Sequence, residues 1–114
     1  MSQHIENADG QGTLVIGHGR SPVTYQISAV RSGEQYTATT TLQAPRDWLL
    51  KQGFRQEALL ERDGAEVIKL YRPERLDVGD DVSVSLSSEP LTCKTREELV
   101  DRFPELDLVR MHRL

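Results

Sequence analysis

The sequence predicts a small, mostly β domain, an antiparallel six-stranded barrel or sandwich with one C-terminal helix. Three segments carry this prediction, because apolar and polar residues alternate along each of them, at 23–29, 36–43 and 82–87. Side chains in a strand point alternately to opposite faces, so each segment has one face for a core and one for water. In the last segment the expected core face holds Val82, Val84 and Leu86.

The first strand is expected at 13–16, after a polar and flexible N-terminal tail at 1–12. The stretch 17–22 interrupts it, because Gly17 and Gly19 permit positive φ and Pro22 cannot donate to a ladder. Two further strands are expected at 23–31 and 35–43, joined by a tight hairpin. Asp47 is expected to cap a short helical turn that Gly53 closes. The Asp63-Gly64 pair predicts a second hairpin, between strands at 54–62 and 65–72.

A helix is predicted at about 96–103, after the last strand with alternating apolar and polar residues. Thr95 and Glu98 have the spacing of a capping box, and Leu99, Val100 and Phe103 form one apolar stripe. Pro104 ends the helix. The segment that follows is rich in large apolar residues, which either add an edge strand, pack over one end of the barrel or dock on another subunit. We therefore expect residues 13–114 to form a single domain.

The charge and composition of the chain limit the kinds of partner that we expect for it. The chain has 114 residues and a net charge of −4, with Lys and Arg scattered among Asp and Glu. Nucleic-acid binding and contact with an anionic membrane both favour a basic face, so neither is expected. The single cysteine, Cys93, allows no internal disulfide, and no stretch has the length or the apolar content of a membrane span or a signal peptide. A soluble protein of the reducing cytoplasm is expected.

Three residues are candidates for ligand binding. His18 and Arg20 flank Gly19 in a stretch that could form a backbone nest for an anion, although two glycines around a histidine also suit an ordinary loop. Trp48 lies in a long connection, where it could stack on a ligand at the barrel mouth. The alternative is that Trp48 is a hydrophobic plug that closes the barrel end.

Two groups of residues are candidates for a subunit interface. Thr37, Thr39 and Thr41 share one side of a strand and form a flat, uncharged face, which is either a contact surface or a solvated outer face rich in β-branched residues. The C-terminal segment contributes Leu108, Met111 and Leu114. Together they predict a homo-oligomer, and an additional protein partner is left open.

No catalytic group, metal site or cofactor is predicted. The acidic residues at 74–81 do not have the spacing of a calcium loop, and the histidines do not have the spacing of metal ligands. Cys93 has no histidine close in sequence to activate it. The expected function is a non-catalytic binding or assembly module that self-associates. The alternative is a small-molecule binder or an enzyme that uses the barrel mouth near Trp48 and His18.

Overall fold

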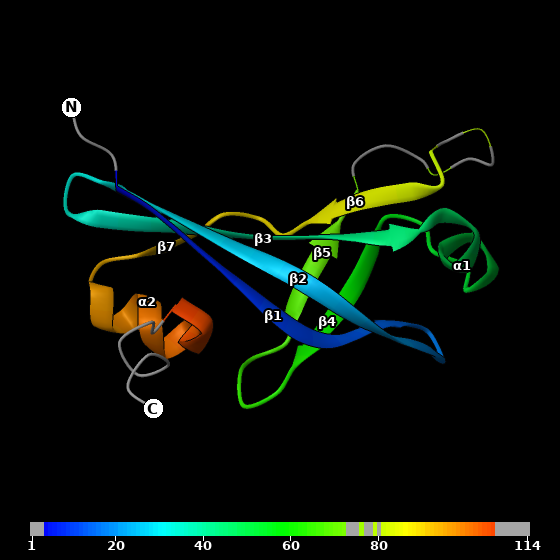
Figure 1. Ribbon diagram of the computed structural model, residues 1–114, viewed down its shortest axis with the longest axis horizontal. Helices are drawn as coiled ribbons and strands as arrows, with labels where there is room; N and C mark the ends of the chain where they lie inside the picture. Colours follow the sequence, from blue (N-terminus) through cyan, green and yellow to red (C-terminus); the bar gives the residue numbers. More distant parts are fainter. Residues whose placement is uncertain (1–3, 73–75, 77–78, 80, 107–114) are drawn as a thin grey trace.

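The protein is a closed, six-stranded antiparallel barrel with one additional strand (Figure 1). The computed structural model describes residues 4–72, 76, 79 and 81–106. Around the barrel the strands follow the order β1–β2–β3–β6–β5–β4, and β4 pairs back with β1. Their bounds are β1 (His4–Ile16), β2 (Gly19–Ser32), β3 (Gln35–Pro45), β4 (Glu57–Arg62), β5 (Ile68–Tyr71) and β6 (Ser83–Ser87). The extra strand, β7 (Leu91–Cys93), pairs with the first part of β3. The predicted fold class is confirmed, and the closed pairing identifies a barrel rather than a sandwich.

Strand β1 begins at His4, well before the strand start predicted from the sequence. It pairs with β2 along its whole length, from His4 opposite Arg31 to Ile16 opposite Gly19. The segment 4–12, expected to be a flexible tail, is therefore part of the barrel wall. This part of the strand was not predicted because its polar residues and glycines do not alternate with apolar residues. Glycine at position 10 has a structural reason, because a Cβ there would overlap the ring of Tyr25.

The alternation that predicted the central strands is confirmed. Inward-facing side chains of β2 and β3 are buried in one core with those of β1, β4, β5 and β6, and the fully buried ones include Leu14, Ile27, Thr40, Leu60, Leu70 and Leu86. The placement of Val82 in the core is wrong. Strand β6 begins only at Ser83, and the Val82 side chain is 73% exposed.

Helical segments lie at opposite ends of the barrel (Figure 1). At one end is α1 (Arg46–Lys51), whose N-cap residue is Pro45 and has no side-chain cap hydrogen bond. The predicted cap at Asp47 is therefore wrong, because Asp47 lies inside the first turn and accepts a hydrogen bond from Arg46 Nε at 3.0 Å. Gly53, with φ of 78°, follows the helix in the left-handed conformation that its position predicted.

The other end carries α2 (Arg96–Arg102) and the 3-10 turn η1 (Pro104–Leu106). The predicted cap is present, since Thr95 Oγ1 accepts a hydrogen bond from Glu98 N at 3.1 Å. Leu99, Phe103 and Leu106 are buried and cover this end of the core. No helix within the described ranges has the length and apolar content needed to cross a bilayer.

Candidate functional site

The most distinctive surface is the outward side of β2, β3 and β6, which we call the hydroxyl face. Directly paired residues of an antiparallel sheet lie on the same side, and the register aligns Gln26 with Thr41 and Thr41 with Ser87. Most of the face consists of uncharged polar side chains, with Val30 opposite Thr37 and Pro45 opposite Ser83 as its apolar members. The polar side chains are Thr24, Gln26, Ser28, Thr37, Thr39, Thr41, Gln43, Ser83, Ser85 and Ser87. The sequence predicted its three threonines, and the register adds the serines of β6 that extend it.

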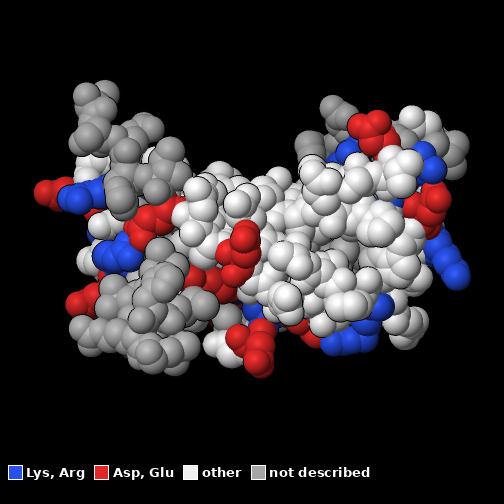
Figure 2. Space-filling view, in the orientation of Figure 1, with Lys and Arg blue, Asp and Glu red and all other residues white. Residues whose placement is uncertain are grey.

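The hydroxyl face is slightly hollowed across β2, β3 and β6, beside Asp9 of the neighbouring strand β1. A depression of about 470 Å³ is lined there by Asp9, Gln26, Thr41, Gln43 and Ser85, among others. Figure 2 shows a broad area without Lys or Arg over the middle strands, with the basic side chains gathered toward the ends and lower rim of the molecule. A surface with few charges can approach a second copy of itself closely, because few charges must lose their hydration.

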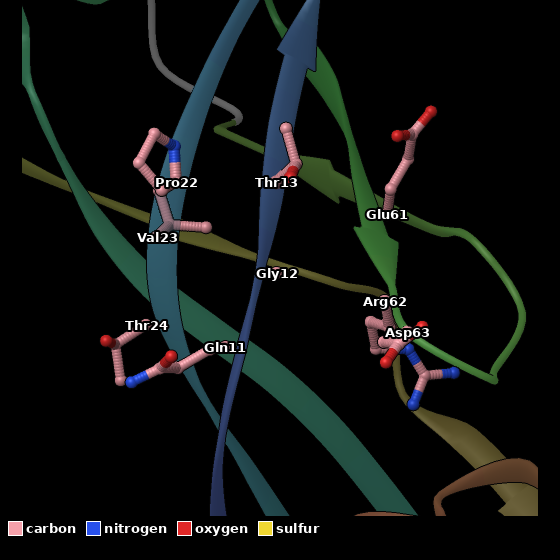
Figure 3. A pocket seen from close by; sticks show the side chains of 9 residues that line it. All are labelled: Gln11, Gly12, Thr13, Pro22, Val23, Thr24, Glu61, Arg62 and Asp63. Carbon is pink, nitrogen blue, oxygen red and sulfur yellow. The ribbon is translucent and has the colours of Figure 1, made fainter.

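A second, larger hollow lies over β1, β2 and β4, where Gly12 contributes no side chain. Figure 3 shows Pro22, Val23 and Thr24 on one side of Gly12 and Glu61, Arg62 and Asp63 on the other. The hollow has a volume of about 660 Å³ and is open to solvent.

The chemistry of this second hollow is limited. Of its two carboxylates, Glu61 is paired with the guanidinium of Arg20. None of the described residues that line it is a histidine, a cysteine or a lysine. An open polar surface of this kind suits a reversible contact better than a reaction that must exclude water.

The three predicted ligand-binding residues occupy one end of the molecule. His18 is exposed in the turn between β1 and β2, and Arg20 is exposed at the start of β2. Trp48 is half-buried in α1 and packs against the core. The turn lies against the end of α1, because a Cβ at Gly19 would overlap the side chain of Gln52. None of the cavities described here is lined by His18, Arg20 or Trp48. The packing of Trp48 favours its interpretation as a plug.

Only some of the predicted interface residues lie in the part of the chain that the structure describes. Thr37, Thr39 and Thr41 are half-buried on the hydroxyl face, each opposite a residue of β2. Leu108, Met111 and Leu114 lie outside the described residues.

Sequence reasoning missed a buried network that ties the barrel to its C-terminal cover. Arg62 faces inward, with its side chain 2% exposed, and its Nη1 donates to both carboxylate oxygens of Glu105 at 2.9 and 2.8 Å. Nε donates to the carbonyl of Glu66 at 3.0 Å, and Nη2 donates to the carbonyl of Arg102 at 3.1 Å. The phenol of Tyr25 donates to the same carboxylate of Glu105.

The network holds its charges in fixed positions. Burial raises the pKa of Tyr25 strongly, and its hydrogen bond to Glu105 and the negative charge of that residue raise it further. The guanidinium of Arg62 also lies over the ring of Phe103, 5.4 Å from its centroid. Because every described partner is structural, this network stabilises the fold and gives no free acid or base for catalysis. The signal in the sequence is an arginine at a core-facing position of β4, where an apolar residue is expected.

Reactive groups are scarce in the described structure. Cys93 is fully buried, and burial, followed by the charge of Glu98, raises the pKa of its thiol, which disfavours the reactive thiolate. No group of three or more His, Cys, Asp or Glu within the described ranges is arranged to hold a metal ion.

Comparison with protein-family models, with curated proteins and with solved structures gives no significant match to this chain. The candidate site therefore depends on the geometry of the hydroxyl face and of the cavities around the barrel.

Proposed function

We propose that the protein is a non-catalytic binding and assembly module that self-associates through the hydroxyl face. The observation that carries this proposal is the register of β2, β3 and β6, which aligns uncharged hydroxyl and amide side chains into one continuous surface. Thr and Ser lose little side-chain entropy when they become ordered in a contact. A two-fold arrangement would place the same face of each copy against the other.

The filled barrel supports a binding role over catalysis. Large apolar residues occupy its interior, α1 covers one end, and α2 with η1 covers the other. The buried polar groups of the network are bonded to other groups of the protein. We also infer a cytoplasmic location, supported by the single buried cysteine, which has no second cysteine to pair with.

Sedimentation velocity over roughly 5 to 200 μM tests the proposal, since a dimer of micromolar affinity dissociates across that range. We expect the full chain to shift from monomer to dimer. Thr39→Lys should raise the dissociation constant of the dimer by at least about tenfold, because it places like charges close together at a two-fold contact.

Glu57→Lys is the matched control, because Glu57 is exposed on β4, a strand that does not pair with β2, β3 or β6. A second control is a chain that ends at Leu106, which keeps Glu105 and the buried Leu106. If only this shortened chain is monomeric, the contact is made by the C-terminal segment and the hydroxyl face is not the interface. A full chain that stays monomeric throughout contradicts self-association.

A further inference from the structure

The barrel wall has an opening at the seam between β5 and β6. Among the described residues these strands pair at one position, Tyr71 opposite Ser87, and after Ser87 the chain turns away to form β7 against β3 (Figure 1). The opening, which we call the seam slot, has a volume of about 250 Å³. Residues that line it include Thr40, Ile68, Tyr71, Leu91 and Phe103.

Thr40 gives the slot its one unexplained polar group. Its side chain is fully buried on the inward face of β3, and its Oγ1 has no hydrogen-bond partner among the described residues. The main chain of Thr40 is satisfied by Ser88, since Thr40 N donates to Ser88 Oγ at 2.9 Å and Ser88 N donates to Thr40 O at 2.8 Å. Only the hydroxyl therefore lacks a partner.

A buried hydroxyl without a partner is costly to stability, and each such group requires an explanation. Valine has nearly the same shape as threonine and would fill the position without that penalty. A residue that weakens the fold at the wall of a cavity is typical of a binding site. A hydroxyl can rotate to donate one hydrogen bond or to accept one, so it suits a ligand with a single polar group.

The walls and charges of the slot narrow the chemical class of this ligand. Apolar walls are formed by Ile68, Leu91 and Phe103. Charged side chains around the slot are balanced, because Lys69 and Arg102 are matched by Glu66 and Glu89, and Arg62 is matched by Glu105. A charged ligand would disturb this balance, whereas an uncharged one would not. The volume is below the roughly 300–1,000 Å³ of sites for drug-sized molecules, so the ligand is small.

We propose that the seam slot binds a small, uncharged and mostly apolar molecule, such as a benzyl alcohol, whose hydroxyl pairs with Thr40. The site is independent of the hydroxyl face, because Thr40 points inward while Thr39 and Thr41 point outward. Monomer and dimer are therefore both expected to bind.

The test is a titration of the full chain, followed by the amide NMR signals of residues around the slot. The probes are benzyl alcohol and toluene, which differ by one hydroxyl. We expect benzyl alcohol to shift the signals of Thr40, Ser88 and Leu91 and to bind more tightly than toluene. Thr40→Val should weaken the binding of benzyl alcohol by about 3- to 10-fold, which corresponds to the loss of one hydrogen bond. The variant should then bind benzyl alcohol no more tightly than toluene.

Two further variants control for structural effects. Thr92→Val makes the same change on the exposed side of β7 and should leave both affinities unchanged. Leu91→Trp should fill the slot and abolish the binding of both probes. Thr40→Val should also raise the melting temperature by a few degrees, because it removes an unpaired hydroxyl.

Equal binding of benzyl alcohol by the wild-type chain and by Thr40→Val would overturn the proposal. The absence of any shift at the slot with either probe would also overturn it, because the slot would then hold water alone.

Discussion

Arg62 and Glu105 form an ion pair that joins the barrel wall to the last turn of the described chain, and one guanidinium nitrogen contacts both carboxylate oxygens. Arg62 Nη1 lies 2.9 and 2.8 Å from the two carboxylate oxygens of Glu105, and the residues are 43 positions apart in sequence. Because both partners are shielded from water, removing one leaves a buried charge without compensation. The pair therefore fixes η1 and α2 over the end of the barrel.

We expect Glu105→Ala to reduce the free energy of unfolding by about 3–5 kcal/mol, because it leaves the Arg62 guanidinium buried and unpaired. Urea unfolding measures this loss. Glu57→Ala, which removes an exposed carboxylate of β4, is the control and should change stability by less than about 0.5 kcal/mol. Equal losses for the two variants would mean that the C-terminal cover does not depend on this pair.

Tyr25 makes stability sensitive to alkaline pH. Its pKa in the folded state is raised, chiefly by burial, above the value of about 10 for an unfolded chain. Above pH 10 the unfolded chain loses this proton while the folded protein keeps it. The unfolded state then binds fewer protons, so stability is fully present below pH 10 and falls as pH rises. Unfolding of the wild type and of Tyr25→Phe at pH 9 to 11.5 should show a shallower fall for the variant. Parallel curves would contradict this assignment.

Gly10 is required by its contact with Tyr25 rather than by a turn. A Cβ at this position would overlap the phenol ring, which is fixed by its hydrogen bond to Glu105. We expect Gly10→Ala to cost about 1–3 kcal/mol through overpacking. Gly79→Ala is a suitable control, because a Cβ there meets no atom within 4 Å. Thermal melts of both variants would decide the matter, and similar melting temperatures would argue against a close approach of β1 to Tyr25.

The cap of α2 should contribute a separate and smaller amount. Thr95→Ala removes the acceptor for Glu98 N and should cost about 1 kcal/mol. Thr95→Ser keeps the hydroxyl oxygen and should stay close to the wild type. If both variants lose the same stability in urea unfolding, the methyl group of Thr95 matters and its cap does not.

The predictable part of the fold was the part with a local pattern. Alternation identified β2, β3 and β6, and the Thr95 to Glu98 spacing identified α2, because these signals lie within a few residues. The length of β1 was underestimated because glycines and polar residues interrupt the alternation along its first part. Two of these glycines, Gly10 and Gly12, lie against the ring of Tyr25. Val82 continued the pattern of β6 but lies outside the strand.

The site was less predictable because it depends on distant parts of the chain. Tyr25 and Glu105 are 80 positions apart, and no local pattern indicates that they meet. The threonines of the hydroxyl face were visible in the sequence, whereas the alignment of Thr41 with Ser87 of β6 is set by strand pairing. Thr40 resembled a normal core position, and only the opening at the seam of β5 and β6 shows that this residue, with its unpaired hydroxyl, lines a cavity.

The central claim, self-association through the hydroxyl face, is tested most directly by amide NMR spectra of the full chain recorded on dilution. A series from roughly 500 to 10 μM spans a micromolar equilibrium. We predict that the signals of Thr37, Thr39 and Thr41 on β3, with those of Ser85 and Ser87 on the neighbouring strand β6, move together as concentration falls. Signals around the exposed Glu57 should stay in place. Spectra that do not change with concentration, or changes that leave these β3 and β6 signals unmoved, would contradict the claim.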